Sequence, residues 1–568
     1  MARARFLKCC LCTFSLLTLW VLSVPRAFAQ YTPDDLAGIK PTESYQHSDI
    51  DSVNLGNGSL ALHIPLISYP QRGNALKVEF QLLYNGRWMQ SSQTCDELAG
   101  TCTSWTQRTS LVNGALFGSA SAYLPNGIYP NEIHTLKSVT KNFTFIYPNS
   151  TTYTYHNYRR MLYEGDGTAH VMGNTGTSTV PPTGGSISET GPWRALDGSG
   201  WLWRTDGTPV ARNGVTYPPT GTGLVTDPNG NQITYSASSI TDTLGRNIPA
   251  PLGQTASDFS GCTGALPTSA AYLWLPPEPG GAAAGFKFCY AVVPGASGFP
   301  NCFGCTATSA GTQLQSVVLP NSTAYTFEYN DRDTGDPQTV NYGSIMKITL
   351  PTGGSISYAY ITGQAFTYFS NSGSDQTDLT TYTRVIASRT VTDSTGSHIW
   401  TYAGNTRPFA NTPETVTVTD PLSNATTHQF NVNYDGSTYE TVTAFYKGSV
   451  SASNLLRSVT LAIAPTTTIY QGVINLQPST RTTTLENNQV TKETYTYDSG
   501  FTFVDLRGSP SRTALFGKVV LVSSFDYGTG AAGAPLRTTT STYAWQSPNT
   551  NYTNYLANNL LDLFRLLK

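Results

Sequence analysis

The sequence contains LPNSTAYTFEY at 319–329 and LPTGGSISYAY at 350–360, two neighbouring stretches that follow one plan. Each opens with Leu-Pro, continues with a small polar turn and ends in alternating strand-forming residues that finish on Tyr. Proline ends a strand because it has no N–H to donate to a β-ladder, and a following glycine supplies the positive φ of a tight turn. The alternation of Thr or Ser with aromatic residues puts hydroxyls on one face and rings on the other. Each stretch therefore predicts a β-hairpin unit.

The same plan recurs elsewhere in the chain, with weaker turns and looser spacing. A single two-stranded hairpin is only marginally stable in water, so each unit needs a neighbour on either side. Repetition at irregular intervals of tens of residues favours an array of hairpins over one compact sandwich. Further copies of the plan are DPNGNQITY (227–235), DSTGSHIWTY (393–402), DPLSNATTHQF (420–430) and TLENNQVTKETYTYDSG (484–500).

Composition supports an all-β protein. Only 12% of the 568 residues are charged, compared with about 25% in an average protein. Gly, Tyr, Thr, Ser and Asn take their place, and these residues favour strands and turns over long helices. Lys and Arg number 33 and Asp and Glu 35, with no basic stripe. The balance gives no indication of a nucleic-acid partner.

The first 29 residues have the pattern of a signal peptide. Arg3, Arg5 and Lys8 precede an apolar run at 9–24, and Ala27-Phe28-Ala29 provides a cleavage site before Gln30. An uncleaved membrane anchor is the alternative, but the run is shorter than the roughly 20 residues of a spanning helix. No later stretch is long and apolar enough to span a bilayer. We expect a secreted or cell-surface protein without a transmembrane span after cleavage.

Six cysteines remain after the signal peptide, an even number that suggests disulfides in an exported chain. The spacing favours a bridge between Cys95 and Cys102, which closes a short loop. The other four can pair among themselves, and the C-x-x-C spacing of the last two leaves a structural zinc site as a weaker alternative, although no second C-x-x-C completes it. The disulfide candidates are Cys95, Cys102, Cys262, Cys289, Cys302 and Cys305.

The repeated phrases resemble the YD repeats of RHS (rearrangement hot spot) proteins. The Asp-Pro-Asn-Gly…Tyr and Tyr-Asp phrases are similar to that repeat, and 51–87 is similar to the region that opens many exported members. The resemblance covers roughly 50–550 through loose, degenerate motifs. It implies a ribbon of antiparallel β-hairpins that coils into a partial shell, in a family where some members enclose a C-terminal toxin and others contact cell surfaces or carbohydrate. Further RHS segments are possible partners, because no closing core or toxin domain follows the repeats here.

Chemical motifs are sparse. The seven histidines show no H-x-x-x-H or H-E-x-x-H spacing, so we expect them in turns or on strand surfaces. Hairpin turns explain the Asp-Gly pairs better than calcium does, and NDRDTGD (330–336) comes nearest to a calcium loop but has no closing Glu. The G-x-G-x-x-G at 528–533 is followed by Ala-Pro, not by the helix of a dinucleotide site. No catalytic residue, metal or cofactor is predicted, although carboxylates far apart in sequence can still meet in space.

Aromatic residues offer the only candidate ligand contacts. Exposed indole and phenol rings stack on sugar rings, and the stretch around WLWR (201–204) together with the tyrosines near 155 could form such a platform. Cross-strand packing of these rings, worth roughly 0.2–1 kcal/mol per pair, is the favoured alternative. The possible glycan-contact aromatics are Trp201, Trp203, Tyr153 and Tyr155.

Taken together, the sequence predicts four parts: a signal peptide at 1–29, an N-terminal all-β region at 30–215, degenerate YD-repeat-like hairpins at 216–545 and a C-terminal tail at 546–568. A Cys-, Pro- and Gly-rich insertion near 250–312 is expected to be a loop or a disulfide-pinned excursion from the ribbon. The expected function is a non-enzymatic scaffold or adhesion protein that contacts cell surfaces or glycans by multivalent display. Two alternatives stay open: a shell fragment of a toxin-delivery protein, and an extracellular carbohydrate-active enzyme.

Overall fold

The computed structural model describes residues 43–543 except 74–75, 87–89, 97–100, 109–127, 131–134, 147–151, 165–167, 180–187, 220–221, 237, 250–253, 279–284, 297–307, 330–342, 371–375, 405–413, 433–437, 464–475 and 505–511. Within these ranges the regular structure is antiparallel β, and the one helix is the short 3-10 element η2 (Ala452–Asn454). The all-β prediction is confirmed. The signal peptide and the C-terminal tail predicted from sequence lie outside the described residues.

The two stretches that predicted the hairpin unit lie in one sheet. β24 (Ala324–Glu328) comes from the first stretch and β26 (Ser355–Ser370) begins in the second, and β25 (Lys347–Thr349) pairs antiparallel with both. The chain therefore adds strands side by side, as the stacking argument required.

The turns of the repeat share one hydrogen-bond pattern. In 319–323 the N–H of Leu319 donates to the carbonyl of Thr323 over 2.8 Å, and the N–H of Ser322 donates back to Leu319 over 2.9 Å. The fourth position has positive φ, +90° at Gly353 but also +65° at Ser322. This is a three-residue hairpin loop closed by a left-handed residue, a position where glycine is favoured and Ser is not predicted. The same pattern occurs at 227–231, 242–246, 350–354 and 420–424.

Aspartate opens several of these turns for a physical reason. The Oδ1 atom of Asp227 accepts N–H groups from Asn229 at 2.9 Å and Asn231 at 2.8 Å. Asp420 accepts the corresponding two N–H groups in its own turn. The carboxylate thus satisfies backbone donors that the tight loop leaves unpaired, which explains the recurrence of Asp-Pro in the sequence.

The largest sheet in the described part of the chain has 20 strands and carries most of the repeats, while the copy at 227–235 lies in a separate four-stranded sheet. Most of its strands follow one another in chain order. It branches at β27 (Gln376–Asp393), whose second half pairs with β28 and whose first half pairs with β5. Its other strands are β5 (Gln90–Asp96), β6 (Thr101–Arg108), β20 (Gln254–Thr255), β21 (Thr268–Trp274), β22 (Phe286–Ala296), β23 (Thr308–Val318), β28 (Gly396–Ala403), β29 (Glu414–Thr419), β30 (Ala425–Val432), β31 (Thr438–Tyr446), β32 (Leu455–Ile463), β33 (Pro478–Leu485), β34 (Gln489–Tyr497), β37 (Val519–Phe525), β38 (Gly528–Thr529) and β39 (Pro535–Thr540).

Smaller sheets precede and accompany the large one. The inner sheet consists of β1 (Tyr45–His47), β2 (Asp51–Asn54), β3 (Leu60–Pro70), β4 (Lys77–Asn85) and β7 (Ile128–Pro130). A second sheet contains β8 (Thr135–Ile146), β9 (Thr152–Tyr163), β10 (Ala169–Asn174), β13 (Trp193–Ala195), β14 (Leu202–Trp203) and β15 (Pro209–Val210). The remaining strands are β11 (Thr177–Thr179), β12 (Ser188–Thr190), β16 (Gly223–Thr226), β17 (Gln232–Tyr235), β18 (Ser239–Thr241), β19 (Asn247–Pro249), β35 (Phe501–Phe503) and β36 (Arg512–Ala514).

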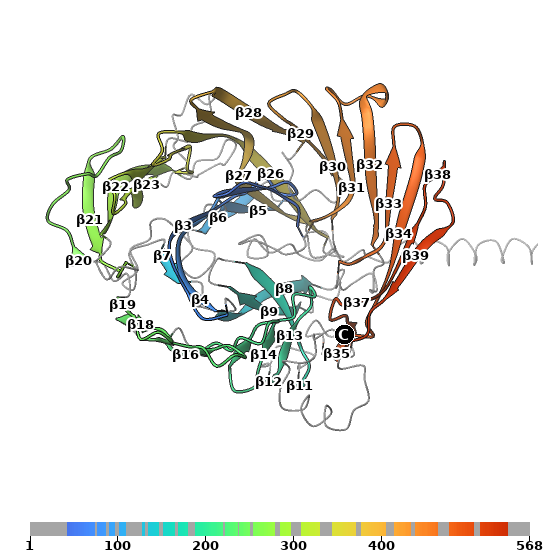
Figure 1. The fold of residues 1–568 in the computed structure, drawn as a ribbon, viewed down its shortest axis with the longest axis horizontal. Coiled ribbons are helices and arrows are strands. Elements are labelled where there is room, and N and C mark those ends of the chain that lie inside the picture. Colours follow the sequence, from blue (N-terminus) through green and yellow to red (C-terminus); the bar gives the residue numbers. More distant parts are fainter. Residues whose placement is uncertain are drawn as a thin grey trace, which may run out of the picture.

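The strands run around a ring, and the inner sheet lies within it (Figure 1). One apolar core joins the inner sheet to the surrounding strands, with Leu62, Ile64 and Phe80 fully buried. The Phe80 ring, for example, lies 4.6 Å from the Trp274 ring on β21. Burial of this core against the ring explains why single-layer hairpins are stable here.

The N-terminal segment is also tied to the ring by polar contacts. Asp51 on β2 accepts hydrogen bonds from Arg389 on β27 and from the Tyr358 hydroxyl on β26, the latter at 2.8 Å. The Tyr402 hydroxyl donates to Gln46 over 2.6 Å. Burial and the neighbouring Asp51 together hold the pKa of Tyr358 well above its usual range.

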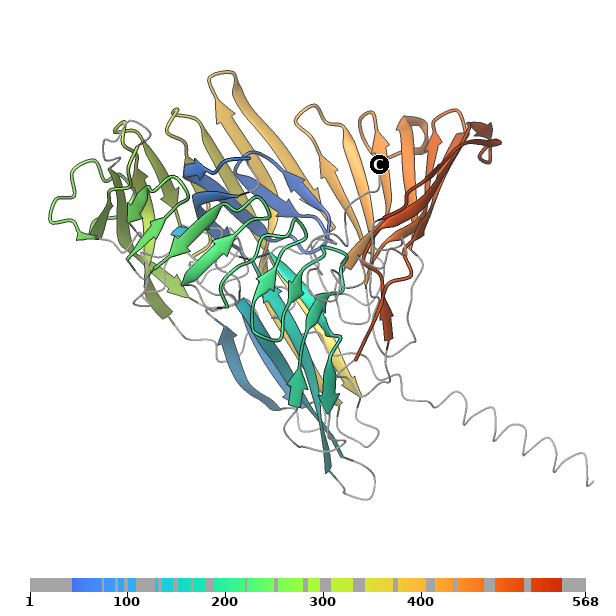
Figure 2. The ribbon, with the colours of Figure 1, turned by 60° about the horizontal axis from the view of Figure 1, so that its bottom comes forward.

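The β35–β36 hairpin, here called the latch hairpin, joins the far end of the ring to its beginning. Phe503 packs with Leu196, and the N–H of Val504 donates to the Asn174 carbonyl over 2.7 Å. The rings of Phe501 and Phe516 lie 4.9 Å apart, and the Arg194 guanidinium on β13 lies 5.8 and 5.6 Å from their centroids. Figure 2 shows the latch hairpin reaching down from the end of the ribbon toward the second sheet.

Strand pairing bears on two predicted features of the chain, the insertion near 250–312 and the boundary at 215/216. The insertion near 250–312 does not leave the ribbon, because its described residues supply β20 to β23 of the large sheet. The apolar strand FKFCYAVV was hidden in sequence by its Gly- and Pro-rich flanks, and it pairs on both sides. At the predicted 215/216 boundary, β-bridges from Val210 to Thr216 and from Thr216 to Thr226 continue the hydrogen bonding between sheets.

The last strands of the ribbon differ from the rest. From β32 to β39 almost every described side chain is half-buried or exposed, and β39 is exposed throughout. The core cluster that contacts the inner sheet ends at Phe430 on β30. In the described part of the chain, this end of the ribbon is a single layer with both faces in contact with solvent.

Candidate functional site

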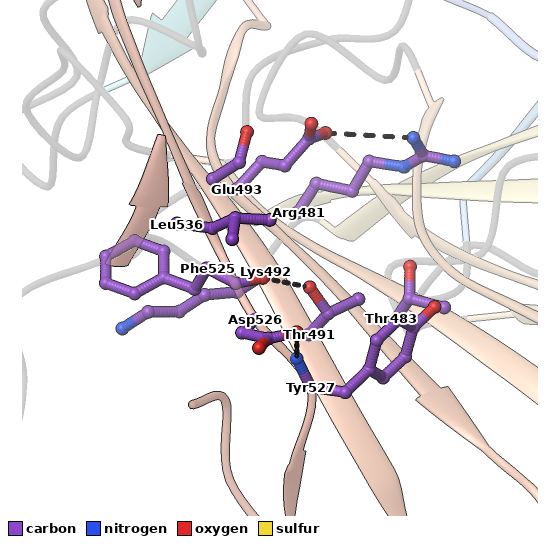
Figure 3. Close-up of a pocket in the computed structure, with 10 residues that line it drawn as sticks. Arg481, Thr483, Thr491, Lys492, Glu493, Phe525, Asp526, Tyr527 and Leu536 are labelled. Atoms are coloured by element: carbon purple, nitrogen blue, oxygen red, sulfur yellow. Dashed lines mark hydrogen bonds and ion pairs between the residues drawn. The ribbon is translucent and has the colours of Figure 1, made fainter. Parts of the chain in front are cut away.

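A pocket of about 340 Å³ lies on this single-layer end of the ribbon. It is formed by β33, β34, β37 and the connection into β39 (Figure 3). Its volume falls within the range of about 300–1,000 Å³ common for small-molecule sites. The lining residues are Arg481, Thr483, Thr491, Lys492, Glu493, Ser524, Phe525, Asp526, Tyr527 and Leu536.

Strand register explains why distant residues meet there. Arg481 pairs with Glu493, and Glu493 pairs with Ser524, so the three residues form one row across β33, β34 and β37. Residues that pair directly on neighbouring strands share a face of the sheet. Starting from the buried Val418 on β29, successive pairs on β30, β31 and β32 lead to Leu485 on β33. Leu485 lies four positions from Arg481, so the two side chains are on the same face of β33. This row therefore lies on the inner face, the face of the ribbon that is covered by the inner sheet farther back.

Charges of both signs occupy that row. Arg481 Nη1 lies 4.0 Å from Glu493 Oε2, with the two side chains 51% and 39% exposed. The Tyr495 hydroxyl donates to the same carboxylate oxygen over 2.7 Å. Burial raises the pKa of Tyr495 to about 12, with Glu493 adding to the shift. An ion pair so exposed contributes less than about 1 kcal/mol to stability, so these groups can exchange partners with a ligand at little cost.

The rest of the pocket mixes hydroxyl, carboxylate and apolar groups. Lys492 Nζ lies 4.4 Å from the centre of the Phe525 ring, and the Thr491 hydroxyl donates to the Phe525 carbonyl over 2.6 Å. Asp526 accepts the N–H of Tyr527 over 2.8 Å. Tyr527 and Leu536 are 49% and 70% exposed. The pocket thus presents hydrogen-bond donors, acceptors and an exposed aromatic ring to solvent.

None of these pocket residues was predicted from the sequence. They come from four strands, β33, β34, β37 and β39, and from the turn that holds Asp526 and Tyr527, and no short motif links them. The alternation in RTTTL and TKETYTY indicates strands with one polar face but does not say which strands are neighbours. Pairing of β34 with β37 across the latch hairpin is what brings Glu493 beside Ser524.

The two predicted tryptophans lie elsewhere, inside the second sheet. Trp201 and Trp203 are each 7% exposed and pack with Leu162 and Met172. The Trp201 indole N–H donates to Glu164 over 3.1 Å. This arrangement agrees with the packing alternative and leaves the indole faces little surface for a sugar. Tyr153 and Tyr155 lie on β9, and their side chains fall outside the described part of the structure.

The cysteines give one bridge among the described residues. Cys262 and Cys289 form a disulfide with a Cα–Cα distance of 5.8 Å, so two of the four cysteines considered for zinc are already used. In the backbone register Cys95 stands opposite Cys102 on β5 and β6, and their side chains are outside the described part. Cys302 and Cys305 also lie outside the described residues.

His170 differs from the expectation that histidines lie in turns or on strand surfaces. It is 2% exposed, with Nδ1 2.7 Å from Asp197 and Nε2 2.6 Å from Glu164. Burial alone would lower the pKa of His170, but Asp197 and Glu164 outweigh it and raise the pKa to about 10. With both nitrogens held by carboxylates, the ring is a buried cation in a structural cluster rather than a base.

The described aspartates of the Asp-Gly pairs, which were weighed as calcium ligands, stabilise turns instead. Asp197 and Asp206 each accept a backbone N–H two residues ahead, from Ser199 and Thr208 at 2.9 Å. No group of three metal-ligating side chains occurs in the described ranges. The nearest calcium-like loop, 330–336, and the Asp-Gly pairs at Asp166 and Asp435 lie outside them.

Comparison with models of known protein families and with curated proteins gives no match. Within the residues that the structure describes, no helix is long and apolar enough to cross a membrane.

Proposed function

We propose that this protein is an exported, non-enzymatic scaffold of the RHS type that contacts cell-surface glycans through the pocket on its inner face. The observation that carries the proposal is the composition of that pocket. Hydroxyl side chains donate to or accept from sugar hydroxyls, carboxylates accept from them, Arg481 donates to them, and the exposed Tyr527 ring offers a stacking surface. The latch hairpin and the buried Asp51–Arg389 contact would keep the ribbon rigid while it binds.

Rigidity matters because ordering a flexible surface on binding costs affinity. A shallow, solvent-exposed pocket is expected to bind a single sugar weakly. Further contacts along the ribbon, as expected from the repeats, and several protein copies on one surface would raise avidity without a new strong site. The signal peptide expected at 1–29 would bring the protein to such surfaces.

Retention of the full-length mature protein on immobilised polysaccharides tests the proposal. Tyr527→Ala removes the exposed ring and is expected to reduce retention several-fold. Leu422→Ala is the matched control, because Leu422 is 82% exposed on a hairpin turn away from the pocket. If no polysaccharide retains the protein, or if both variants behave alike, the proposal is wrong.

A carbohydrate-active enzyme is the second candidate, because Glu493 and Asp526 line the same pocket. Two carboxylates beside a sugar are the minimum for general acid and nucleophile or base chemistry. New reducing ends after incubation with a retained polysaccharide, abolished by Glu493→Gln or Asp526→Asn, would establish this candidate. Retention without new reducing ends would establish the scaffold.

A further inference from the structure

The pocket has an apolar side that a plain sugar does not need. Leu536 is 70% exposed at a bulge where β37 and β39 shift register, between Ser524 and Phe525. The strand that carries it, PLRTTT, is exposed along its whole length, and Leu536 is its one large apolar side chain. Phe525 and Tyr527 also belong to the lining, but their rings point in opposite directions (Figure 3), so Leu536 is the apolar side chain nearest to Glu493 and Arg481.

The polar side is built for more than hydroxyl groups. Glu493 and Asp526 provide carboxylate acceptors, which bind an amide N–H more strongly than a neutral acceptor does. Arg481 provides a cationic donor for a carbonyl oxygen, whereas Lys492 lies on the other face of β34 with its ammonium over the Phe525 ring. Figure 3 shows Glu493 and Arg481 on one side of Leu536 and Asp526 on the other, with Lys492 turned toward the Phe525 ring.

We propose that the pocket selects sugars that carry an acetamido group, the 2-acetamido-2-deoxyhexoses. The amide N–H donates to Asp526 or Glu493, the carbonyl accepts from Arg481, and the methyl group lies against Leu536. A hydroxyl in place of the acetamido group supplies no methyl group for Leu536 and no carbonyl oxygen that extends to Arg481. This inference rests on the proposed glycan-binding function and names the ligand class of the same pocket.

The decisive comparison uses two soluble disaccharides that differ at the acetamido position, N,N′-diacetylchitobiose and cellobiose. Titration of the full-length mature protein is expected to show binding about tenfold tighter for the acetylated sugar, the discrimination typical of one added apolar contact. Retention on chitin beads is then compared with retention on cellulose beads, where many copies of each sugar allow multivalent binding. Equal binding of the two sugars overturns the inference and leaves glycan binding standing. Binding of neither sugar, with no retention on either bead, overturns both.

Leu536→Ser tests the methyl contact directly. The variant is expected to lose most of the preference for the acetylated sugar while its affinity for cellobiose stays the same. Leu422→Ser, an equally exposed leucine elsewhere, is expected to keep the preference. An unchanged ratio of affinities in Leu536→Ser contradicts the assignment. Because Leu536 is exposed, the substitution is not expected to unfold the protein, and its circular dichroism should match that of the Leu422→Ser control.

Discussion

Arg389 Nη2 donates to Oδ1 of Asp51 over 2.8 Å, although the two residues lie 338 positions apart in the chain. Both side chains are nearly inaccessible, at 10% and 1% exposed. The contact ties the inner sheet to the middle of the ribbon. A buried ion pair adds little stability compared with an apolar pair of similar size. Removing only one of its two charged side chains is costly, because the other charge is then buried without a partner.

Asp51→Asn is therefore expected to destabilise the protein by about 3–5 kcal/mol, because it leaves the Arg389 guanidinium buried without a countercharge. Urea unfolding followed by tryptophan fluorescence measures the change. The matched control is Glu328→Gln, which removes the partner of Lys347 in a pair 38% and 36% exposed and should cost less than about 1 kcal/mol. Similar losses in both variants would show that Asp51 does not anchor the inner sheet.

The His170 cluster predicts a pH dependence of stability. The folded-state pKa of His170 is raised from 6.5 to about 10, so its stabilisation is complete below pH 6.5 and is lost as pH rises toward 10. Asp197, whose pKa is lowered, contributes above pH 3.8 and loses its contribution as pH falls. Thermal unfolding should therefore show a plateau between these limits and a decline at alkaline pH.

His170→Gln should lower the free energy of unfolding at pH 6 by about 3–5 kcal/mol, because Asp197 and Glu164 lose the cation between them. The variant should also show a smaller loss of stability at alkaline pH than the wild type does. His398→Gln is the control, since that ring is 42% exposed and lies 3.9 Å from Asp393. A decline at alkaline pH that persists undiminished in His170→Gln would refute the assignment.

The disulfide between Cys262 and Cys289 closes a segment with a sequence separation of 27. Replacing both cysteines by serine should lower stability by about 3 kcal/mol through the larger entropy of the unfolded chain. Thermal unfolding of the variant measures the loss, and non-reducing peptide mapping of the wild type should recover the two peptides linked. A wild-type map that joins either cysteine to another partner would contradict the structure.

Close packing at the latch hairpin predicts a steric effect. A Cβ added at Gly173 would lie 2.7 Å from Leu196 and 2.8 Å from Phe503, closer than side chains can approach. Gly173→Ala should therefore displace the latch hairpin and raise hydrogen exchange in β35 and β36. Gly285→Ala is the control, because its nearest neighbour is 3.7 Å away. Equal exchange in the two variants would mean that the hairpin does not depend on this contact.

Local sequence patterns predicted the units but not their assembly. Asp-Pro-x-Gly and Leu-Pro-x-Gly turns were evident because proline, aspartate and glycine each satisfy a local backbone requirement. Ser322 and Ser423 occupy the same left-handed position, although serine has no preference for positive φ that would predict it. The insertion was misjudged because Gly and Pro flanks suggested a loop, whereas the strand within them pairs with two neighbours.

Local residue patterns were enough to predict the all-β class, many of the turns and the growth of one sheet in chain order, because these depend on contacts between near neighbours. The ring, the inner sheet within it, the buried His170 cation and the pocket arise from contacts made in three dimensions. Each of these joins residues dozens to hundreds of positions apart. The two-residue period of a strand specifies which face a side chain takes, but it carries no information about which distant strand or sheet will cover that face.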